Sequence, residues 1–381
     1  MVCPYIPEIE YSDFRARISQ KVAGQRIPLV GSLELTFRCN LRCQHCYVAH
    51  GHQGIRGQEE LSYSEITRII DEIAAEGCLW LLLTGGEPLM RPDFVDIYTY
   101  AKRKGMLVTL FTNGTMITPR LADYLVEYRP FNLEISLYGY TQETYERVTG
   151  IPGSHARCMG GIELLVERGI PLRLKTVVMT LNKHELGEMQ DFAKGLGVEF
   201  RYDTMINSGI DGNGRPRQLR ISPQEVLEID RQRPGFGEEL RSLFSTQTER
   251  LPEEPFLYVC GAGVRSFHID PYGKLSLCLM SRRLTYDLRT GSFHQGWSEY
   301  LAGVRYQKPR GDYFCGRCEL LPICDQCPGW AEFEHGEPQK PVDFLCQGAH
   351  LRAEAYNLLE KQQELILADN LDSKEIRHEI E

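Results

Sequence analysis

Short apolar runs alternate with amphipathic stretches through the first half of the chain, and this alternation restricts the fold more than any other feature. The apolar runs cover residues 33–37, 79–83, 106–111, 132–137, 172–179 and 198–204, and the amphipathic stretches cover 63–76, 92–104, 119–128, 158–168 and 183–196. Ser62 and Glu65 match a helix-capping box at the start of the first amphipathic stretch. Six repeats of strand–helix alternation predict an α/β fold with a parallel sheet.

Three cysteines follow the first apolar run at C-x3-C-x2-C spacing: Cys39, Cys43 and Cys46. Three thiolates in one loop can hold three irons of a 4Fe–4S cluster and leave the fourth iron open to another ligand. Taken alone, the motif also fits a zinc site or buried thiols. The loop Thr84-Gly-Gly-Glu-Pro88 ends the second apolar run and favours the cluster.

Together, the cysteine loop and the Gly-Gly-Glu loop resemble the radical S-adenosylmethionine (SAM) enzymes. The resemblance implies a partial (β/α)6 barrel, similar to part of a TIM barrel, with its chemistry at the carboxyl ends of the strands. It also implies that the open iron binds SAM and that one electron cleaves SAM to a 5′-deoxyadenosyl radical. The enzyme class would then be oxidoreductase or lyase.

The resemblance further implies which residues contact SAM. The loop 85–87 is expected at the SAM amino group, Asn113 near the pocket, Ser136 at the ribose and Arg157 at the SAM carboxylate, a task suited to a planar guanidinium. Lys175, Thr176 and Val178 are expected to border the adenine, and His45 to pack against the cluster or adenine. The residues expected to bind the cofactor are therefore Gly85, Gly86, Glu87, Asn113, Ser136 and Arg157. Without the resemblance, these positions also fit plain turns, a strand hydroxyl and a surface arginine.

A second set of cysteines occupies the last third of the chain: Cys260, Cys278, Cys315, Cys318, Cys324, Cys327 and Cys346. The set resembles the SPASM extension of radical SAM enzymes, which implies two auxiliary 4Fe–4S clusters. By resemblance, residues 260, 278 and 327 hold the first cluster, with its fourth ligand unassigned, and residues 315, 318, 324 and 346 hold the second. A turn at Gly273 is expected to bring Cys260 and Cys278 side by side.

Two features of this set leave alternatives open. The spacing before Cys327 is x2 where the family usually has x3, and C-x2-C pairs also suit zinc. Cys3, Cys78 and Cys158 match no motif and are interpreted as structural thiols.

Five segments are predicted along the chain. They are an N-terminal extension (1–31) with a helix near 13–22, the barrel (32–204), a bridging region (205–259) with helices near 223–231 and 237–244, the SPASM region (260–348) and a C-terminal helix (349–381). The tail is expected to be helical over 350–367.

Composition excludes several classes of protein. The net charge of −9 argues against a nucleic-acid surface, and no apolar run approaches the length of a membrane span. The N-terminus lacks a secretory signal. The thirteen cysteines are therefore interpreted as reduced thiols in a cytoplasmic protein, not as disulfides.

SPASM enzymes chiefly modify peptides and proteins. Those that mature sulfatases carry an aspartate base directly after the second SPASM cysteine, and Leu279 in that position cannot accept a proton. The hypothesis is therefore modification of a ribosomally made precursor peptide by cross-linking, epimerisation or splicease-type backbone excision. Because about 30 residues before the barrel are too few for a leader-binding domain, a separate leader-recognition protein is expected. A reductant such as flavodoxin or ferredoxin is also expected.

Two other functions compete with this hypothesis. One is small-molecule chemistry of the tetrapyrrole type, and the other is a non-catalytic iron–sulfur electron carrier, which would need neither the Gly-Gly-Glu loop nor Arg157. The residues identify no catalytic acid or base and no target bond. Tyr138, Tyr202 and Asp203 lie near predicted strand ends and are candidates to face substrate.

Overall fold

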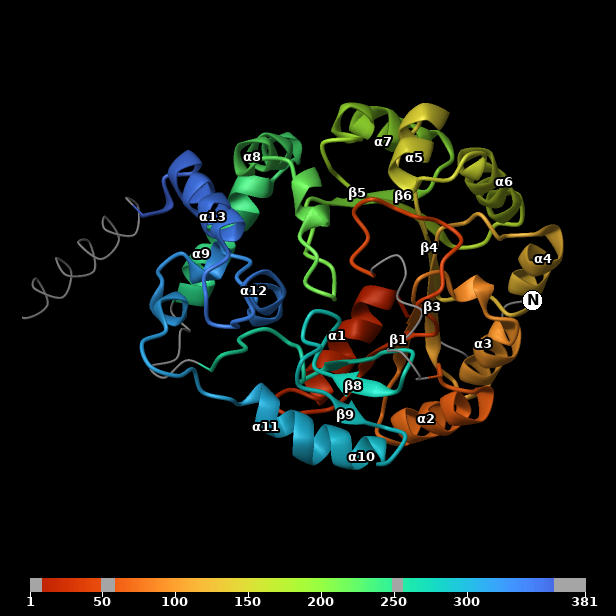
Figure 1. Ribbon diagram of the computed structural model, residues 1–381, viewed down its shortest axis with the longest axis horizontal. Coiled ribbons are helices and arrows are strands. Elements are labelled where there is room, and N and C mark those ends of the chain that lie inside the picture. The colour runs from red at the N-terminus through yellow and green to blue at the C-terminus, as the bar shows by residue number, and fades with distance from the viewer. Residues whose placement is uncertain (1–8, 49–58, 249–255, 360–381) are drawn as a thin grey trace, which may run out of the picture.

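The computed structural model describes residues 9–48, 59–248 and 256–359 (Figure 1). All six predicted strands are present: β1 (Val30–Glu34), β2 (Trp80–Thr84), β3 (Leu107–Thr112), β4 (Asn132–Ser136), β5 (Leu172–Val177) and β6 (Glu199–Asp203). They pair in parallel, in chain order, from β1 to β6. The predicted partial barrel is therefore confirmed.

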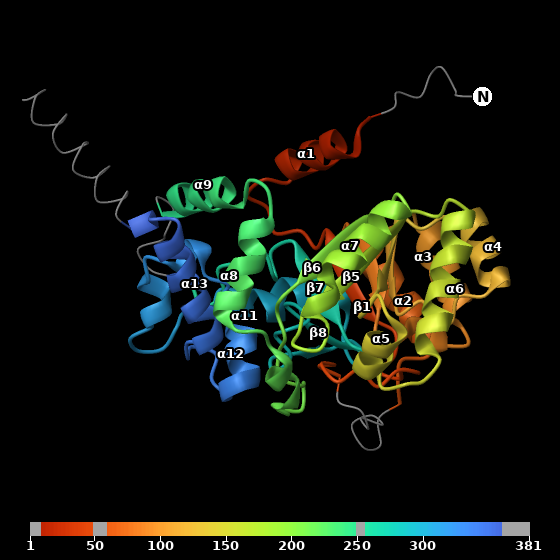
Figure 2. The same cartoon turned by 90° about the horizontal axis from the view of Figure 1, so that it is seen from above.

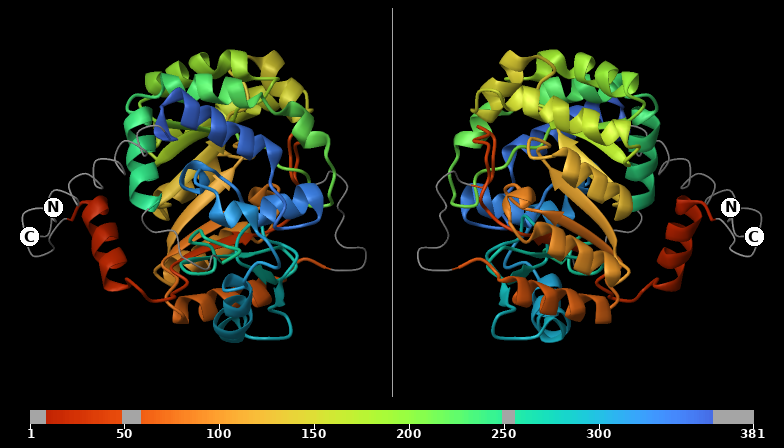
Figure 3. Two further views of the ribbon diagram at one scale, coloured as in Figure 1. Left: turned by 90° about the vertical axis from the view of Figure 1, so that its left-hand side faces the viewer. Right: turned by 90° about the vertical axis from the view of Figure 1, so that its right-hand side faces the viewer.

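The helices between these strands cover the outer face of the sheet (Figure 3). They are α2 (Tyr63–Ala75), α3 (Phe94–Arg103), α4 (Pro119–Glu127), α5 (Gln142–Thr149), α6 (Ser154–Glu167) and α7 (Leu186–Gly195). Ser62 and Glu65 form the predicted capping box, and Ile66, Ile69, Ile70 and Ile73 are buried on one face of α2. The sequence patterns did not predict α5, which has few apolar residues, and α6 begins four residues before its predicted start.

Successive side chains along each strand point to opposite faces of the sheet. Apolar side chains such as Leu83, Leu110 and Leu174 are fully buried in the main hydrophobic cluster beneath the helices. The alternate residues point to the inside of the partial barrel, and many of them are polar, including Glu134 and Lys175. The inside of this barrel is therefore not the layered apolar core of a closed TIM barrel.

The C-terminal third extends the same sheet. Strand β7 (Ser266–Ile269) pairs in parallel with β1, and β8 (Lys274–Ser276) and β9 (Tyr286–Asp287) follow in antiparallel order. The predicted turn at Gly273 is present, with φ of 82° and a hydrogen bond from its N–H to the carbonyl of Asp270. Nine strands thus form one sheet in the order β6-β5-β4-β3-β2-β1-β7-β8-β9 within the described residues.

Four later helices lie at the open side of the partial barrel: α8 (Pro223–Gln232), α9 (Phe236–Thr248), α12 (Pro328–His335) and α13 (Asp343–Ala355) (Figure 1). Two short helices, α10 (Phe293–Gln295) and α11 (Ala302–Arg305), lie below β8 and β9, and α10 contacts α2. Helix α13 packs on α8, where Arg352 Nη2 lies 2.9 Å from Asp230 Oδ2. The predicted boundary at 348/349 falls inside α13, and the expected tail helix over 350–367 runs into residues 360–381, outside the described residues.

Helix α1 (Tyr11–Lys21) crosses the amino ends of the strands and stands apart from the other helices (Figure 2). The rings of Tyr11 and Phe131 lie 4.9 Å apart, and those of Phe14 and Trp80 lie 6.2 Å apart. No residue of α1 is buried. Among the helices that the structure describes, none has both the length and the apolar character required to cross a bilayer.

Candidate active site

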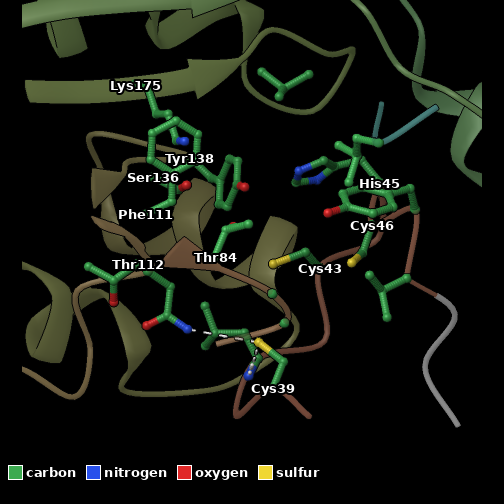
Figure 4. Close-up of a pocket in the computed structure, with 18 of the residues that line it drawn as sticks. Cys39, Cys43, His45, Cys46, Thr84, Phe111, Thr112, Ser136, Tyr138 and Lys175 are labelled. Carbon is green, nitrogen blue, oxygen red and sulfur yellow. Dashed lines mark hydrogen bonds between the residues drawn. The ribbon is translucent and has the colours of Figure 1, made fainter. Parts of the chain in front are cut away.

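A cavity of about 920 Å³ opens at the carboxyl ends of the parallel strands. All three thiols of the first motif, Cys39, Cys43 and Cys46, line it. Figure 4 shows these cysteines on one side of the cavity and Phe111, Ser136 and Lys175 on the other. The three thiols that the sequence spacing singles out therefore line one cavity together.

The cysteine loop is fastened to the end of helix α5. The N–H of Arg42 donates to the carbonyl of Thr149 at 2.8 Å, and the N–H of Gln44 donates to the carbonyl of Val148 at 3.0 Å. Because α5 ends beneath the loop, the helix that the sequence patterns did not predict supports the three thiols.

Burial raises the pKa of all three thiols, that of Cys46 to about 12. Thiols in such a site deprotonate when a metal core compensates the charge that burial disfavours. Cys39 Sγ also accepts a hydrogen bond from the N–H of Leu41 at 3.4 Å. This set of donors fits the 4Fe–4S cluster of the sequence prediction, because three cavity-facing sulfurs from one loop leave the cavity side of the cluster open.

The two glycines of the Gly-Gly-Glu loop are needed for packing between loops. A Cβ on Gly85 would lie 2.3 Å from the carbonyl oxygen of Thr36, and a Cβ on Gly86 would lie 2.4 Å from that of Arg38. The N–H of Gly86 donates to the carbonyl of Thr36 at 2.7 Å. Both glycines line the cavity. The backbone atoms closest to them belong to Thr36 and Arg38, just before the cysteine loop.

Glu87 points away from the cavity. Its carboxylate is completely buried and accepts hydrogen bonds from the Thr112 hydroxyl and the Asn113 N–H, both at 2.7 Å, and from the Leu89 N–H at 3.2 Å. Burial raises the pKa of Glu87 to about 7 against the opposing effect of these donors. In this arrangement Glu87 joins the loops after β2 and β3, and it is not among the residues that line the cavity.

The other expected SAM contacts divide into two groups. Asn113 and Ser136 line the cavity, and Asn113 Nδ2 donates to Asn40 Oδ1 at 2.8 Å beside the first cysteine. Arg157 does not line it: this exposed residue lies in the first turn of α6 and borders a separate depression. The SAM carboxylate contact expected of Arg157 therefore has no support in the geometry.

His45 and Tyr138 lie in edge contact, with ring centroids 4.5 Å apart, and both line the cavity. Lys175, Thr176, Tyr202 and Asp203 line it as well. Arg201 was missed by sequence reasoning, although the polar alternation of β6, Glu-Phe-Arg-Tyr-Asp, indicates that it faces inward.

Sequence reasoning also missed a buried ionic network beneath the cysteine loop. Both oxygens of the Glu34 carboxylate lie 2.9 Å from Arg282 Nη2; Oε1 accepts from the Tyr47 hydroxyl at 2.9 Å, and Oε2 lies 3.2 Å from His268 Nε2. Burial by itself would raise the pKa of Glu34, but Arg282 and His268 outweigh it and lower that pKa to about 2. The network ties β1 to β7, to the residue after Cys46 and to the loop after Cys278.

The C-terminal cysteines fall into two groups. Burial, together with the neighbouring thiols of Cys327 and Cys260, raises the pKa of Cys278 to about 12. Burial likewise raises the pKa of Cys315, with added effects from Cys318 and Cys346, and Cys324 lies in the same group. These neighbours are the cysteines that the SPASM resemblance assigns to each ligand set, and the two auxiliary clusters stay a prediction.

The spacing of the thiols bears on the zinc alternative. Within residues 9–48, 59–248 and 256–359, no three Cys, His, Asp or Glu side chains are placed to hold one metal ion. The sulfurs around a 4Fe–4S cluster stand farther apart than those around zinc, whose Zn–S bonds are only about 2.3 Å.

Replacing Gly86 with alanine is expected to push the two loops apart, because the new Cβ meets backbone atoms that cannot swing away. We expect a cost of about 1–3 kcal/mol and a lower Tm, together with weaker SAM binding in equilibrium dialysis. Gly160→Ala in α6 is the matched control, because its Cβ would meet nothing within 4 Å. Equal Tm and equal SAM affinity in the Gly86→Ala variant would contradict this role.

Comparison with known proteins agrees with the geometry. A sequence model of the Radical SAM superfamily matches residues 33–194. The Fe-coproporphyrin III synthase of Methanosarcina barkeri is 35% identical over 328 residues, which cover 76% of this chain and 80% of that protein. The AdoMet-dependent heme synthase of the same organism is 37% identical over 177 residues, 46% of this chain, so the match spans only 50% of that relative.

Peptide maturases are similar over more of the chain. The mycofactocin maturase MftC of Mycobacterium ulcerans is 29% identical over 341 residues, 86% of this chain and 90% of that protein. The crystal structure of Streptococcus suis SuiB bound to its precursor peptide SuiA superposes with a TM-score of 0.66 over 91% of this chain and 84% of that chain. Its sequence identity of 17% establishes similarity of fold alone.

Proposed function

Because the chain belongs to the radical SAM superfamily, we propose that this enzyme modifies a ribosomally made precursor peptide through radical chemistry of the SPASM type. The observation that carries the proposal is the arrangement of three thiols on one wall of a cavity in a chain that is similar to MftC along almost its whole length. Bound SAM and the 4Fe–4S cluster would supply a 5′-deoxyadenosyl radical for hydrogen abstraction.

The chain's own residues have separate tasks in this proposal. Cys39, Cys43 and Cys46 would hold the cluster, and the wall formed by Gly85, Gly86, Asn113 and Ser136 would bind SAM against it. Glu87 positions this wall through its hydrogen bonds to the loop after β3. Arg157 stays in the proposed set only if α6 shifts when SAM binds.

We further propose two auxiliary 4Fe–4S clusters, one held by Cys260, Cys278 and Cys327, the other by Cys315, Cys318, Cys324 and Cys346. We also propose the five segments predicted from the sequence, with boundaries at 31/32, 204/205, 259/260 and 348/349. Reduced thiolate ligands suit a cytoplasmic location.

The proposed partners are the precursor peptide, a one-electron reductant such as flavodoxin or ferredoxin, and a separate leader-recognition protein.

A second candidate has its own support. The Fe-coproporphyrin III synthase is 35% identical to this chain, against 29% for the MftC of Mycobacterium ulcerans, and both match along most of the chain. A tetrapyrrole substrate is therefore the alternative that must be tested beside the peptide.

The deciding experiment uses anaerobically reconstituted enzyme with SAM and dithionite. We expect 5′-deoxyadenosine, and we expect mass spectrometry to find a modified product when short peptides encoded beside the gene are supplied with the enzyme. A product from iron coproporphyrin III and none from any peptide would favour the second candidate. Absence of 5′-deoxyadenosine would favour a non-catalytic electron carrier.

A further inference from the structure

The inner faces of β4, β5 and β6 carry a cluster of charged side chains around one buried carboxylate. Only 3% of Glu134 is exposed, and this residue lies between three cations. Its Oε1 lies 3.2 Å from Arg173 Nη1, and its Oε2 lies 3.4 Å from Lys175 Nζ and 2.8 Å from Arg201 Nη2. Arg173 has a second ion pair, with Glu199, whereas Lys175 and Arg201 share the single oxygen Oε2.

Lys175 and Arg201 both line the cavity that contains the cysteine thiols. Lys175 Nζ lies over the ring of Phe111, 2.8 Å from its centroid, and Arg201 keeps 48% of its side chain exposed. Burial lowers the pKa of Lys175 to about 7 despite the nearby Glu134, so its ammonium is incompletely compensated. Two cations that share one carboxylate oxygen retain the capacity to bind a further anion.

The described part of the cavity wall favours an anionic ligand. Among the described residues, the charged side chains that line it are Arg38, Arg42, Lys175, Arg201 and the acidic Asp203, in a chain whose net charge is −9. Arg38 is paired with Glu60, with Nε 3.5 Å from Oε2, so the excess comes from the other three cations. Asp203 Oδ1 accepts from the N–H of Met205 at 2.8 Å, and in the described part of the chain it forms no ion pair with Arg201. SAM carries one net positive charge and a three-thiolate cluster about one negative charge, so loading both leaves the cationic excess in place.

We propose that Lys175 and Arg201 form a subsite that binds a carboxylate of the substrate. This inference rests on the proposed function and adds the chemical class of the group that the enzyme recognises. Lys175 lies across the cavity from the thiols (Figure 4), and Arg201 lines the same cavity, so a carboxylate held by both would direct the rest of the substrate toward the side where the radical forms. The carboxylate belongs to a peptide or to the propionate side chain of a tetrapyrrole.

The test measures binding to anaerobically reconstituted enzyme with SAM present. The probes are N-acetyl-glycyl-tyrosine as the free acid, the same dipeptide as its amide, and coproporphyrin III. We expect the free acid to bind about tenfold tighter than the amide, or coproporphyrin III to bind with a spectral shift, depending on which source supplies the carboxylate. Lys175→Met and Arg201→Met should each lower the affinity for the carboxylate probe about tenfold. Lys175→Arg should bind the probe almost as tightly as the wild-type enzyme.

Lys183→Met is the matched control, because this partly exposed lysine pairs with Glu225 of α8 and does not line the cavity. It should leave all probe affinities unchanged. Equal binding of acid and amide together with no binding of coproporphyrin III would overturn the proposal. So would loss of SAM affinity in Lys175→Met, which would assign the subsite to the carboxylate of SAM. Formation of 5′-deoxyadenosine in the same samples tests the proposed function separately.

Discussion

The triple variant Cys39→Ala, Cys43→Ala, Cys46→Ala is expected to form no detectable 5′-deoxyadenosine while it keeps most of its iron. The three thiols line the cavity, and none of the seven C-terminal cysteines does, so the substitutions should remove only the cluster that binds SAM. Iron should fall from roughly twelve to roughly eight atoms per chain if two auxiliary clusters remain. Iron analysis, electron paramagnetic resonance and chromatography of the nucleoside products check the three parts of this expectation.

Cys78→Ala is the matched control for the loss of a thiol. Cys78 is buried in the main hydrophobic cluster and does not line the cavity, so this variant should retain both its iron and nucleoside formation. The assignment fails if the triple variant still cleaves SAM, or if reconstituted wild-type protein contains zinc in place of iron.

Glu34→Gln is expected to destabilise the protein by about 3–5 kcal/mol at neutral pH, because it leaves the largely buried Arg282 without its carboxylate. Thermal unfolding should show a Tm lower by about 5 °C or more. The cysteine loop should also loosen, since Tyr47 loses its acceptor directly after Cys46. Glu167→Gln is the matched control: Glu167 is 71% exposed, and its replacement should change stability by no more than about 0.5 kcal/mol.

The same network predicts how stability depends on pH. The pKa of Glu34 is lowered to about 2 in the folded state, so the stability that it contributes is present above its usual pKa of 4.5 and is lost as pH falls from there toward 2. Burial lowers the pKa of His268 from 6.5, so protonation of the unfolded chain below that pH acts in the same direction. Wild-type Tm should therefore fall below pH 6.5, and below pH 4.5 it should fall more steeply than the Tm of Glu34→Gln. Parallel curves for the two proteins below pH 4.5 would contradict the assignment.

Local patterns predicted most of the barrel. The six apolar runs became the six parallel strands because short β-rich segments separated by amphipathic stretches leave few other ways to bury apolar surface. Strand β1 nevertheless begins three residues earlier than predicted. Strand β1 also ends at Glu34, three residues before the predicted end at residue 37, because the N–H of Phe37 donates to Glu60 Oε1 and not to a neighbouring strand. Helix α5 escaped prediction because only Tyr145 and Val148 supply apolar side chains in its eight residues.

The candidate site divides in the same way. Cys39, Cys43 and Cys46 were predictable because their spacing within one loop already brings them together. The resemblance assigned Arg157 to the SAM carboxylate. In the structure this residue of α6 borders a separate depression and does not line the cavity of the thiols. The partners of Glu34 could not be foreseen, since His268 and Arg282 lie 234 and 248 residues away along the chain.

The sequence by itself determined the order of strands and helices and the short-range cysteine spacing that specifies iron–sulfur chemistry, because both depend on neighbours within a few residues. Tertiary structure alone decided which polar side chains face the cavity, that Gly85 and Gly86 serve loop packing, and that Lys175 and Arg201 share one oxygen of Glu134. Those relations depend on how distant strands align, since each contact becomes favourable only when the sheet has placed its partners side by side.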